Sequence, residues 1–152
     1  MSKQSAGILL YKKVVNDLQI FLVHPGGPFF KNKDEGSWSI PKGEFLDDED
    51  ALIAAKREFE EETGQAIDGD FISLKSIKQK GGKTVYAWAV EGDIDHETIL
   101  SNVFDLEWPP RSGKMITIPE VDRADWFDVT AAKQKINPAQ VLFIERLIEI
   151  LR

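Results

Sequence analysis

The chain has no cysteine and only two histidines among its 152 residues. Without cysteine there can be no disulfide, no thiolate nucleophile and no cysteine-based zinc site. The two histidines, His24 and His96, share no spacing typical of metal ligands, and we interpret both as structural or exposed residues. The chemistry of this chain must therefore depend on other side chains.

Long apolar runs are also missing. The first 13 residues contain too few consecutive apolar side chains for a signal peptide or a membrane span. We therefore expect a cytoplasmic protein with no membrane partner. Charged residues make up 30% and hydrophobic residues 42% of the chain, and no internal repeat is present. This composition predicts a single globular domain over residues 1–152 with a substantial core.

Positive charge is scarce. The chain has 19 Lys and Arg against 26 Asp and Glu, which gives a formal net charge of −7. We do not expect such a protein to bind nucleic acid through charge alone. An acidic protein that acts on phosphates must overcome repulsion of its substrate, and divalent cations held between carboxylates and phosphate oxygens can do so.

One stretch has the features of a well-defined helix. Acidic residues at positions 47–50 precede a run of good helix formers without Pro or Gly, and Gly64 follows that run. The pattern predicts a helix over residues 51–63, with Asp47 or Asp48 as N-cap and Gly64 as the residue that ends it. We expect the helix to face the core through Leu52, Ile53 and Phe59.

Three glutamates of this helix share one face. Glu58, Glu61 and Glu62 stand at i, i+3 and i+4. One interpretation is a solvated acidic face, which is common on surface helices. The other is a site for hard divalent cations, which bind oxygen ligands and cancel the mutual repulsion. The surrounding pattern favours the cation site, because Gly43, Glu49 and Arg57 precede the glutamates at defined spacings. The spacings are G-x5-E-x7-R-E-F-x-E-E-x-G-Q.

This pattern resembles the Nudix box, and the chain is similar to the Nudix hydrolases. Gln65 is the one departure, because an aliphatic residue usually stands at that position, and it affects how the chain packs after the helix. The resemblance implies an α/β (α+β) fold, an α/β/α sandwich in which a mixed, curved sheet lies between the box helix and a C-terminal helix. The order of the strands cannot be derived from the sequence.

The resemblance also implies roles for the box residues. Mg²⁺ or Mn²⁺ would be held by Glu58, Glu61 and Glu62, together with a backbone carbonyl of Lys42 or Gly43. Arg57 would hold a catalytic glutamate in place. The residues that would support the helix and loop are Gly43, Glu49 and Gly64.

The general base remains open between two residues. Nudix enzymes differ in this, and by resemblance the base is either Glu61 or a further carboxylate beyond the box. Our first candidate for that further carboxylate is Glu107, with Asp105 and Glu120 as alternatives. An exposed strand glutamate is the competing interpretation of Glu107.

The resemblance implies hydrolysis of a phosphoanhydride in a nucleoside diphosphate linked to a group X. The run from Trp38 to Glu44, WSIPKGE, is similar to the dinucleoside polyphosphate and diphosphoinositol branches. A dinucleoside polyphosphate is therefore our first expectation, and the acidic composition argues against diphosphoinositols. Alternatives are sanitation of nucleoside triphosphates and cleavage of ADP-ribose or nucleotide sugars. The absence of proline between Pro41 and Pro109 disfavours ADP-ribose.

A different class of function is a Nudix-fold module that senses a nucleotide without cleaving it. Such modules commonly lose box carboxylates, whereas this chain keeps all of them. As contacts to a small nucleotide we expect Lys42, Arg111, Phe29 and Trp108, although each could instead serve packing or solvation. The sequence does not indicate the oligomeric state.

The remaining elements are predicted from alternation and turn residues. We expect strands at 6–12, 19–24, 71–80, 83–91, 102–108 and 124–128, with a two-residue turn at Gly81-Gly82. Asn137 and Pro138 predict the start of a C-terminal helix, with Asn137 as N-cap and Pro138 at its first position.

Overall fold

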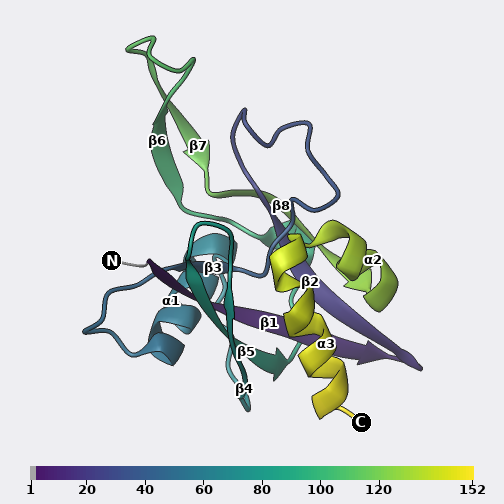
Figure 1. Ribbon diagram of the computed structural model, residues 1–152. Coiled ribbons are helices and arrows are strands. Elements are labelled where there is room, and N and C mark those ends of the chain that lie inside the picture. Colours follow the sequence, from purple (N-terminus) through teal and green to yellow (C-terminus); the bar gives the residue numbers. More distant parts are fainter. Residues whose placement is uncertain (1–2) are drawn as a thin grey trace.

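The computed structural model describes residues 3–152 and forms a sheet with helices on both faces (Figure 1). The strands are β1 (Gln4–Val14), β2 (Asp17–Pro25), β3 (Lys42–Glu44), β4 (Ile72–Lys78), β5 (Thr84–Glu91), β6 (Val103–Glu107), β7 (Met115–Pro119) and β8 (Val121–Asp128). The α-helices are α1 (Ala51–Thr63), α2 (Val129–Lys135) and α3 (Val141–Ile150), and short 3₁₀ turns span His96–Thr98 and Pro138–Gln140.

The main sheet is mixed. Its strands run in the order β4-β5-β1-β2-β8, with β3 paired to β1 beside this path. β1 and β5 are parallel, whereas β1 pairs with β2 and β3, β2 with β8, and β4 with β5 in antiparallel fashion. Strands β6 and β7 form a separate two-stranded hairpin that projects from the body (Figure 1). The mixed α+β architecture that the sequence predicted is confirmed.

Strand β1 lies at the centre of the protein and is buried on both of its faces. Leu9 and Tyr11 belong to an apolar cluster that includes residues of α3, whereas Ile8 and Leu10 belong to a second cluster with residues of α1. A strand covered on both faces has a continuous apolar sequence rather than an alternating one, which explains the run AGILLY. Two cores on opposite faces of the sheet therefore hold α1 and α3 (Figure 1).

The box helix has the predicted bounds but a different N-cap. Asp50 has extended backbone angles, and its Oδ2 accepts a hydrogen bond from Ile53 N at 3.1 Å. The expectation that Asp47 or Asp48 caps the helix is therefore wrong. Ile53 is 62% exposed, so its predicted core position is also wrong, whereas Phe59 is fully buried as expected. At the other end Gly64 adopts φ 76° and closes the helix, as predicted.

We expect Asp50→Ala to lower the free energy of unfolding by about 1 kcal/mol, because the first turn loses its side-chain acceptor. Urea denaturation followed by circular dichroism would measure the change. Asp48→Ala is the matched control, since Asp48 is exposed outside the helix and should change stability by less than about 0.5 kcal/mol. Equal losses in both variants would contradict the assignment of the cap.

Local irregularities account for the other differences from the predicted strands. The pairing of β4 with β5 shifts register between Ser73 and Ser76, where Lys75 adopts φ 64°. This bulge explains the imperfect alternation of residues 71–80. The following turn is longer than the predicted Gly81-Gly82 pair, because Gln79 N donates to Lys83 O and thereby encloses Lys80 as well.

The C-terminal part adds one strand that the sequence did not predict. Strand β7 pairs with β6 in a hairpin in which Ile116 faces Leu106 and Ile118 faces Phe104. Asn137 caps the 3₁₀ turn that leads into α3 by accepting a hydrogen bond from Ala139 N at 2.9 Å, as its sequence context predicted. Within residues 3–152, none of the helices combines the length and the apolar character that crossing a membrane requires.

Candidate active site

The box glycine lies where β3 joins the sheet. β3 pairs with β1 so that Gly43 stands opposite Ala6 and Lys42 opposite Gly7. A Cβ atom on Gly43 would overlap the carboxylate of Glu58, so a side chain at this position would displace that carboxylate. Glycine is therefore required for close approach of the β3 backbone to the carboxylate face of α1.

The carboxylates of Glu58 and Glu62 are held against this backbone. Oε1 of Glu62 accepts a hydrogen bond from Lys42 N at 3.2 Å. Burial raises the pKa of Glu62 to about 8, although that hydrogen bond opposes the shift. Burial, together with the charge of Glu61, raises the pKa of Glu58 to about 7 against the opposing effect of Arg57. Burial thus disfavours the ionised form of both carboxylates.

Arg57 connects three of the box glutamates. Its Nε and Nη2 donate to the two carboxylate oxygens of Glu49 at 3.0 and 2.9 Å. Its Nη1 donates to Glu58 at 2.9 Å and to both oxygens of Glu61 at 3.3 Å. The two hydrogen bonds from Arg57 to Glu49 fix the plane of the guanidinium group. Glu49 thus orients Arg57, and Arg57 in turn holds two of the candidate ligands.

The donor set fits a hard divalent cation. Mg²⁺ and Mn²⁺ prefer carboxylate and carbonyl oxygens, and burial raises the pKa of Glu58 and of Glu62, a cost of ionisation that a bound cation would offset. Among residues 3–152, however, no three His, Asp or Glu side chains converge as a formed metal cluster. Arg57 draws Glu58 and Glu61 together, while Glu62 is bonded to Lys42. Binding of a cation would therefore require small rotations of these side chains.

A fourth carboxylate, Glu120, interacts with this group. The backbone N–H of Asn102 donates to the carbonyl of Glu61 at 2.8 Å, and the N–H of Glu120 donates to the carbonyl of Asn102 at 2.8 Å. The foot of the β6–β7 hairpin is thus attached to the last turn of α1. Burial and the charge of Glu61 raise the pKa of Glu120, and the charge of Glu120 in turn raises the pKa of Glu58 and Glu62.

The structure does not bring Glu107, our first candidate, to these carboxylates. Glu107 ends β6, five residues beyond Asn102, a distance of roughly 17 Å along an extended strand. Its two carboxylate oxygens accept hydrogen bonds from Arg111 N and Gly113 N, so the side chain organises the turn of its own hairpin. Asp105, on the same strand, accepts a hydrogen bond from Thr117 across the hairpin. Sequence reasoning ranked Glu107 above Glu120, because the fold that separates them was not known.

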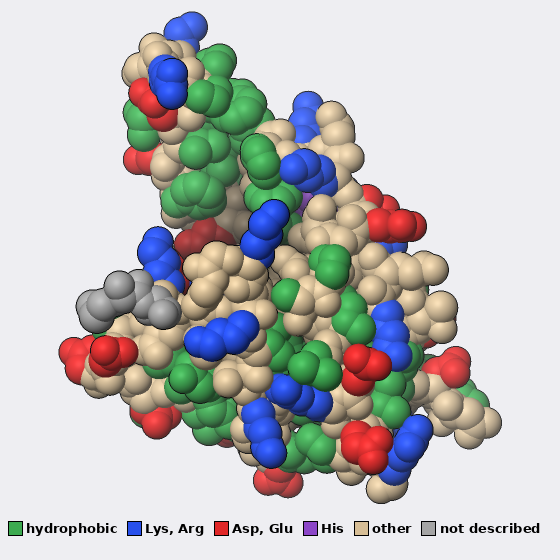
Figure 2. All heavy atoms as spheres, in the orientation of Figure 1, with side chains coloured by type: hydrophobic (Ala, Val, Ile, Leu, Met, Phe, Trp, Pro, Cys, Tyr) green, Lys and Arg blue, Asp and Glu red, His purple; other side chains and the backbone are tan. Residues whose placement is uncertain are grey.

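A hollow lies at the foot of the β6–β7 hairpin (Figure 2). Figure 2 shows acidic side chains at the base of this hollow and Lys or Arg side chains beside it. In the loop after β2, Phe29 is 60% exposed, and Lys33 Nζ lies 3.8 Å from the centre of its ring. Trp108 and Arg111 belong to the hairpin turn, farther from α1. Lys42 is the one expected contact that also bonds a box glutamate through its backbone.

The departure of Gln65 from the box pattern has a structural reason. Its side chain donates a hydrogen bond to Thr98 at 3.0 Å, which connects the end of α1 to the 3₁₀ turn at His96–Thr98. Ile67, two residues later, packs against the apolar cluster on the α1 face of the sheet. The chain thus supplies the aliphatic contact at a neighbouring position.

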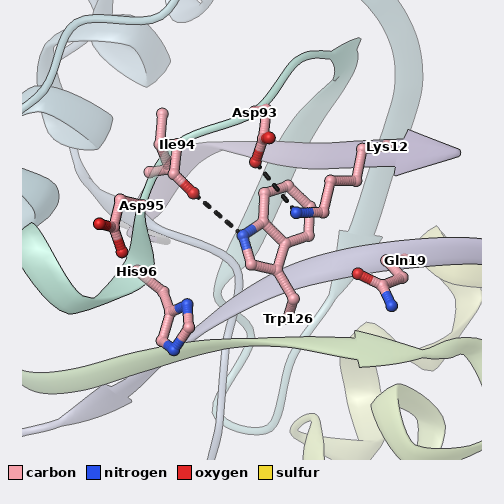
Figure 3. Close-up of a pocket in the computed structure, with 7 residues that line it drawn as sticks. All are labelled: Lys12, Gln19, Asp93, Ile94, Asp95, His96 and Trp126. Carbon is pink, nitrogen blue, oxygen red and sulfur yellow. Dashed lines mark hydrogen bonds and ion pairs between the residues drawn. The ribbon is translucent and has the colours of Figure 1, made fainter. Parts of the chain in front are cut away.

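A cavity of about 510 Å³ lies elsewhere, at the far end of β1 (Figure 3). Its Lys12 points at Asp93, at 3.0 Å, and lies over the ring of Trp126, while Trp126 Nε1 donates to Ile94 O. Lys12 is five residues along β1 from Gly7, which pairs with Lys42, so roughly 16 Å separates this cavity from the box. The charged and polar groups here largely satisfy one another, and we do not include the cavity in the active site.

Comparisons with known proteins agree with the geometry of the box. An Ap4A hydrolase of C. elegans shares the fold with a TM-score of 0.68 and 18% identity, over 97% of each chain. The NUDIX domain of Shewanella oneidensis NrtR complexed with ADP ribose has a TM-score of 0.68 and 15% identity, over 100% of this chain and 90% of that one. A Nudix hydrolase of M. smegmatis has a TM-score of 0.59 and 16% identity, over 97% of this chain and 84% of that one. No curated protein sequence matches the chain significantly. The NUDIX domain model matches residues 1–147, and the chain therefore belongs to the NUDIX domain family.

Proposed function

We propose that the chain hydrolyses a phosphoanhydride bond of a nucleoside diphosphate linked to X, in a reaction that depends on Mg²⁺ or Mn²⁺. The observation that carries the proposal is the position of Glu58 and Glu62 against the backbone of Lys42 and Gly43. Glu58, Glu62 and Glu61 would hold the cation, with a carbonyl of β3. A bound divalent cation would neutralise the phosphate oxygens and make phosphorus more electrophilic.

The protein side chains divide the remaining tasks. Arg57, fixed by Glu49, keeps Glu58 and Glu61 in position. Either Glu61 or Glu120 would accept the proton of the attacking water, because the charges of these two carboxylates interact with each other and with Glu58. We prefer Glu120 over Glu107 as the carboxylate contributed from outside the box, since the charge of Glu120 interacts with Glu61. The raised pKa of Glu120 suits a general base that works near neutral pH.

We infer that X is a second nucleotide, so that the substrate is a dinucleoside polyphosphate. The WSIPKGE run and the exposed Phe29 beside Lys33 support this choice. A small nucleotide is a more suitable partner than nucleic acid for a protein of net charge −7. The alternatives are a nucleoside triphosphate, ADP-ribose or a nucleotide sugar as substrate.

A substrate panel tests this proposal. Diadenosine tetraphosphate, nucleoside triphosphates, ADP-ribose and ADP-glucose would be incubated with the purified protein and Mg²⁺ or Mn²⁺, and products separated by ion-exchange chromatography. We expect the largest kcat/KM for diadenosine tetraphosphate and no turnover in EDTA. Tight nucleotide binding without any cleavage would instead support the sensing module, and preferential cleavage of ADP-ribose would contradict the assigned substrate.

A further inference from the structure

A pocket of about 260 Å³ lies between the loop after β2 and the start of α3, and Lys42 lines it. Its volume is just below the range of about 300–1,000 Å³ that is typical of sites for whole small ligands. The pocket therefore suits part of a substrate rather than all of it. Lys42 places it next to the carboxylate group, because the backbone N–H of the same residue bonds Glu62.

The charge of this pocket is opposite to that of the protein. Two lysines, Lys33 and Lys42, line it, and none of its lining residues is acidic, although the chain as a whole carries seven excess negative charges. Neither lysine belongs to an ion pair found within residues 3–152. An anion in the pocket would form charge-assisted hydrogen bonds with the two lysines that line it.

The polar groups of the pocket include uncommitted hydrogen-bond donors. Asn137 uses its side-chain oxygen to cap the turn before α3, which leaves its NH₂ group to donate. The hydroxyl of Ser37 lines the same pocket. The nearby carboxylate of Asp34 is already engaged by Trp38 Nε1 and Lys135, so it offers little repulsion to an anion. Such a set of donors and cations suits phosphate oxygens, which only accept.

We propose that this pocket binds a phosphate group of X, so that the chain selects substrates in which X carries phosphate of its own. The proposal rests on the proposed function, because it assigns the pocket to the same substrate that the carboxylates hold. A substrate in which X is a neutral sugar would leave the lysines without a counter-charge. Substrates with an extended phosphate chain are therefore favoured over ADP-ribose or nucleotide sugars.

Binding of inorganic phosphate in EDTA tests the pocket without catalysis. Phosphate would be titrated against chloride at matched ionic strength, and ¹H–¹⁵N spectra would follow the Trp38 indole and the amides of Ser37 and Asn137. Lys33→Met removes one cation, and Lys31→Met is its matched control, because Lys31 is exposed on the same loop and does not line the pocket. Asn137→Asp adds a negative charge while keeping a good cap, and Asn137→Ser keeps both the cap and the neutral charge.

We expect phosphate to shift these signals in the wild type, in Lys31→Met and in Asn137→Ser. Lys33→Met and Asn137→Asp should weaken binding about tenfold, the usual effect of one charge-assisted hydrogen bond. The ratio of kcat/KM for diadenosine tetraphosphate over ADP-ribose should fall in the same two variants. Unchanged phosphate affinity in both, or shifts confined to other residues, would overturn the proposal. Phosphate binding that needs Lys33 in a protein that cleaves no substrate would support the pocket and refute the proposed function.

Discussion

Replacing Glu62 with Gln should lower kcat at least about a hundredfold while leaving the protein folded. The amide keeps an oxygen that can accept the hydrogen bond from Lys42 N, but it removes the charge that the cation needs. Loss of groups that merely support metal ligands typically costs 10–100-fold in metal affinity or activity, so loss of a ligand should cost at least as much. Steady-state kinetics with the best substrate of the panel, over a range of Mg²⁺ concentrations, would measure the effect.

The stability of the same variant provides the internal control. Burial raises the pKa of Glu62 from 4.5 to about 8, so the unfolded chain releases this proton at lower pH than the folded one. The metal-free protein therefore loses stability progressively as the pH rises from about 4.5 to 8, because Glu62 ionises in the unfolded chain while it stays protonated in the folded one. Glu62→Gln should be at least as stable as the wild type at pH 8 in EDTA. A variant that retains activity within threefold of the wild type would contradict the role of Glu62.

The second large effect distinguishes two glutamates outside the box. We expect Glu120→Gln to lower kcat by roughly 10²–10⁴, the usual contribution of a general base, with little change in KM. Glu107→Gln is its matched control, since the same change of charge occurs on the neighbouring hairpin. Because Glu107 accepts hydrogen bonds from Arg111 N and Gly113 N, its replacement should affect the turn rather than the chemistry. The pH dependence of kcat/KM would show whether the acidic limb, where a general base becomes protonated, depends on Glu120.

The reverse result would support the ranking made from the sequence, in which Glu107 stands ahead of Glu120 as the carboxylate beyond the box. A large loss in Glu107→Gln with near wild-type activity in Glu120→Gln would mean that the hairpin bends over the site during turnover. Equal and small effects in both variants would leave Glu61 as the base. Either result leaves the assignment of Glu58 and Glu62 intact, because that assignment depends on their contacts with β3.

The box helix could be predicted from the sequence almost completely. Its bounds follow from helix formers between acidic residues and Gly64, and these signals are local. The need for glycine at position 43 was implied by the family pattern, and the structure adds the physical reason, a carboxylate oxygen where a Cβ would be. The apolar runs and the turn residues between them likewise predicted most strands of the main sheet, although not their order.

Features that depend on distant contacts could not be predicted in this way. The importance of Glu120 arises because Asn102 bonds the end of α1 and thereby positions the residue after β7, and no spacing in the sequence encodes that contact. Glu107 attracted attention through its alternating neighbours, but the same alternation belongs to a hairpin that leads away from the site. Asp50 caps α1 in place of Asp47 or Asp48. The sequence could not distinguish them, because adjacent aspartates are chemically equivalent as caps.

Manganese binding tests the central claim most directly. Electron paramagnetic resonance would count free Mn²⁺ during titration of the protein together with a non-hydrolysable dinucleoside polyphosphate analogue. The account predicts saturable binding by the wild type and an affinity at least about tenfold lower in Glu58→Gln and Glu62→Gln. Binding of equal affinity in all three proteins, or no binding by the wild type, would show that these glutamates do not form the cation site.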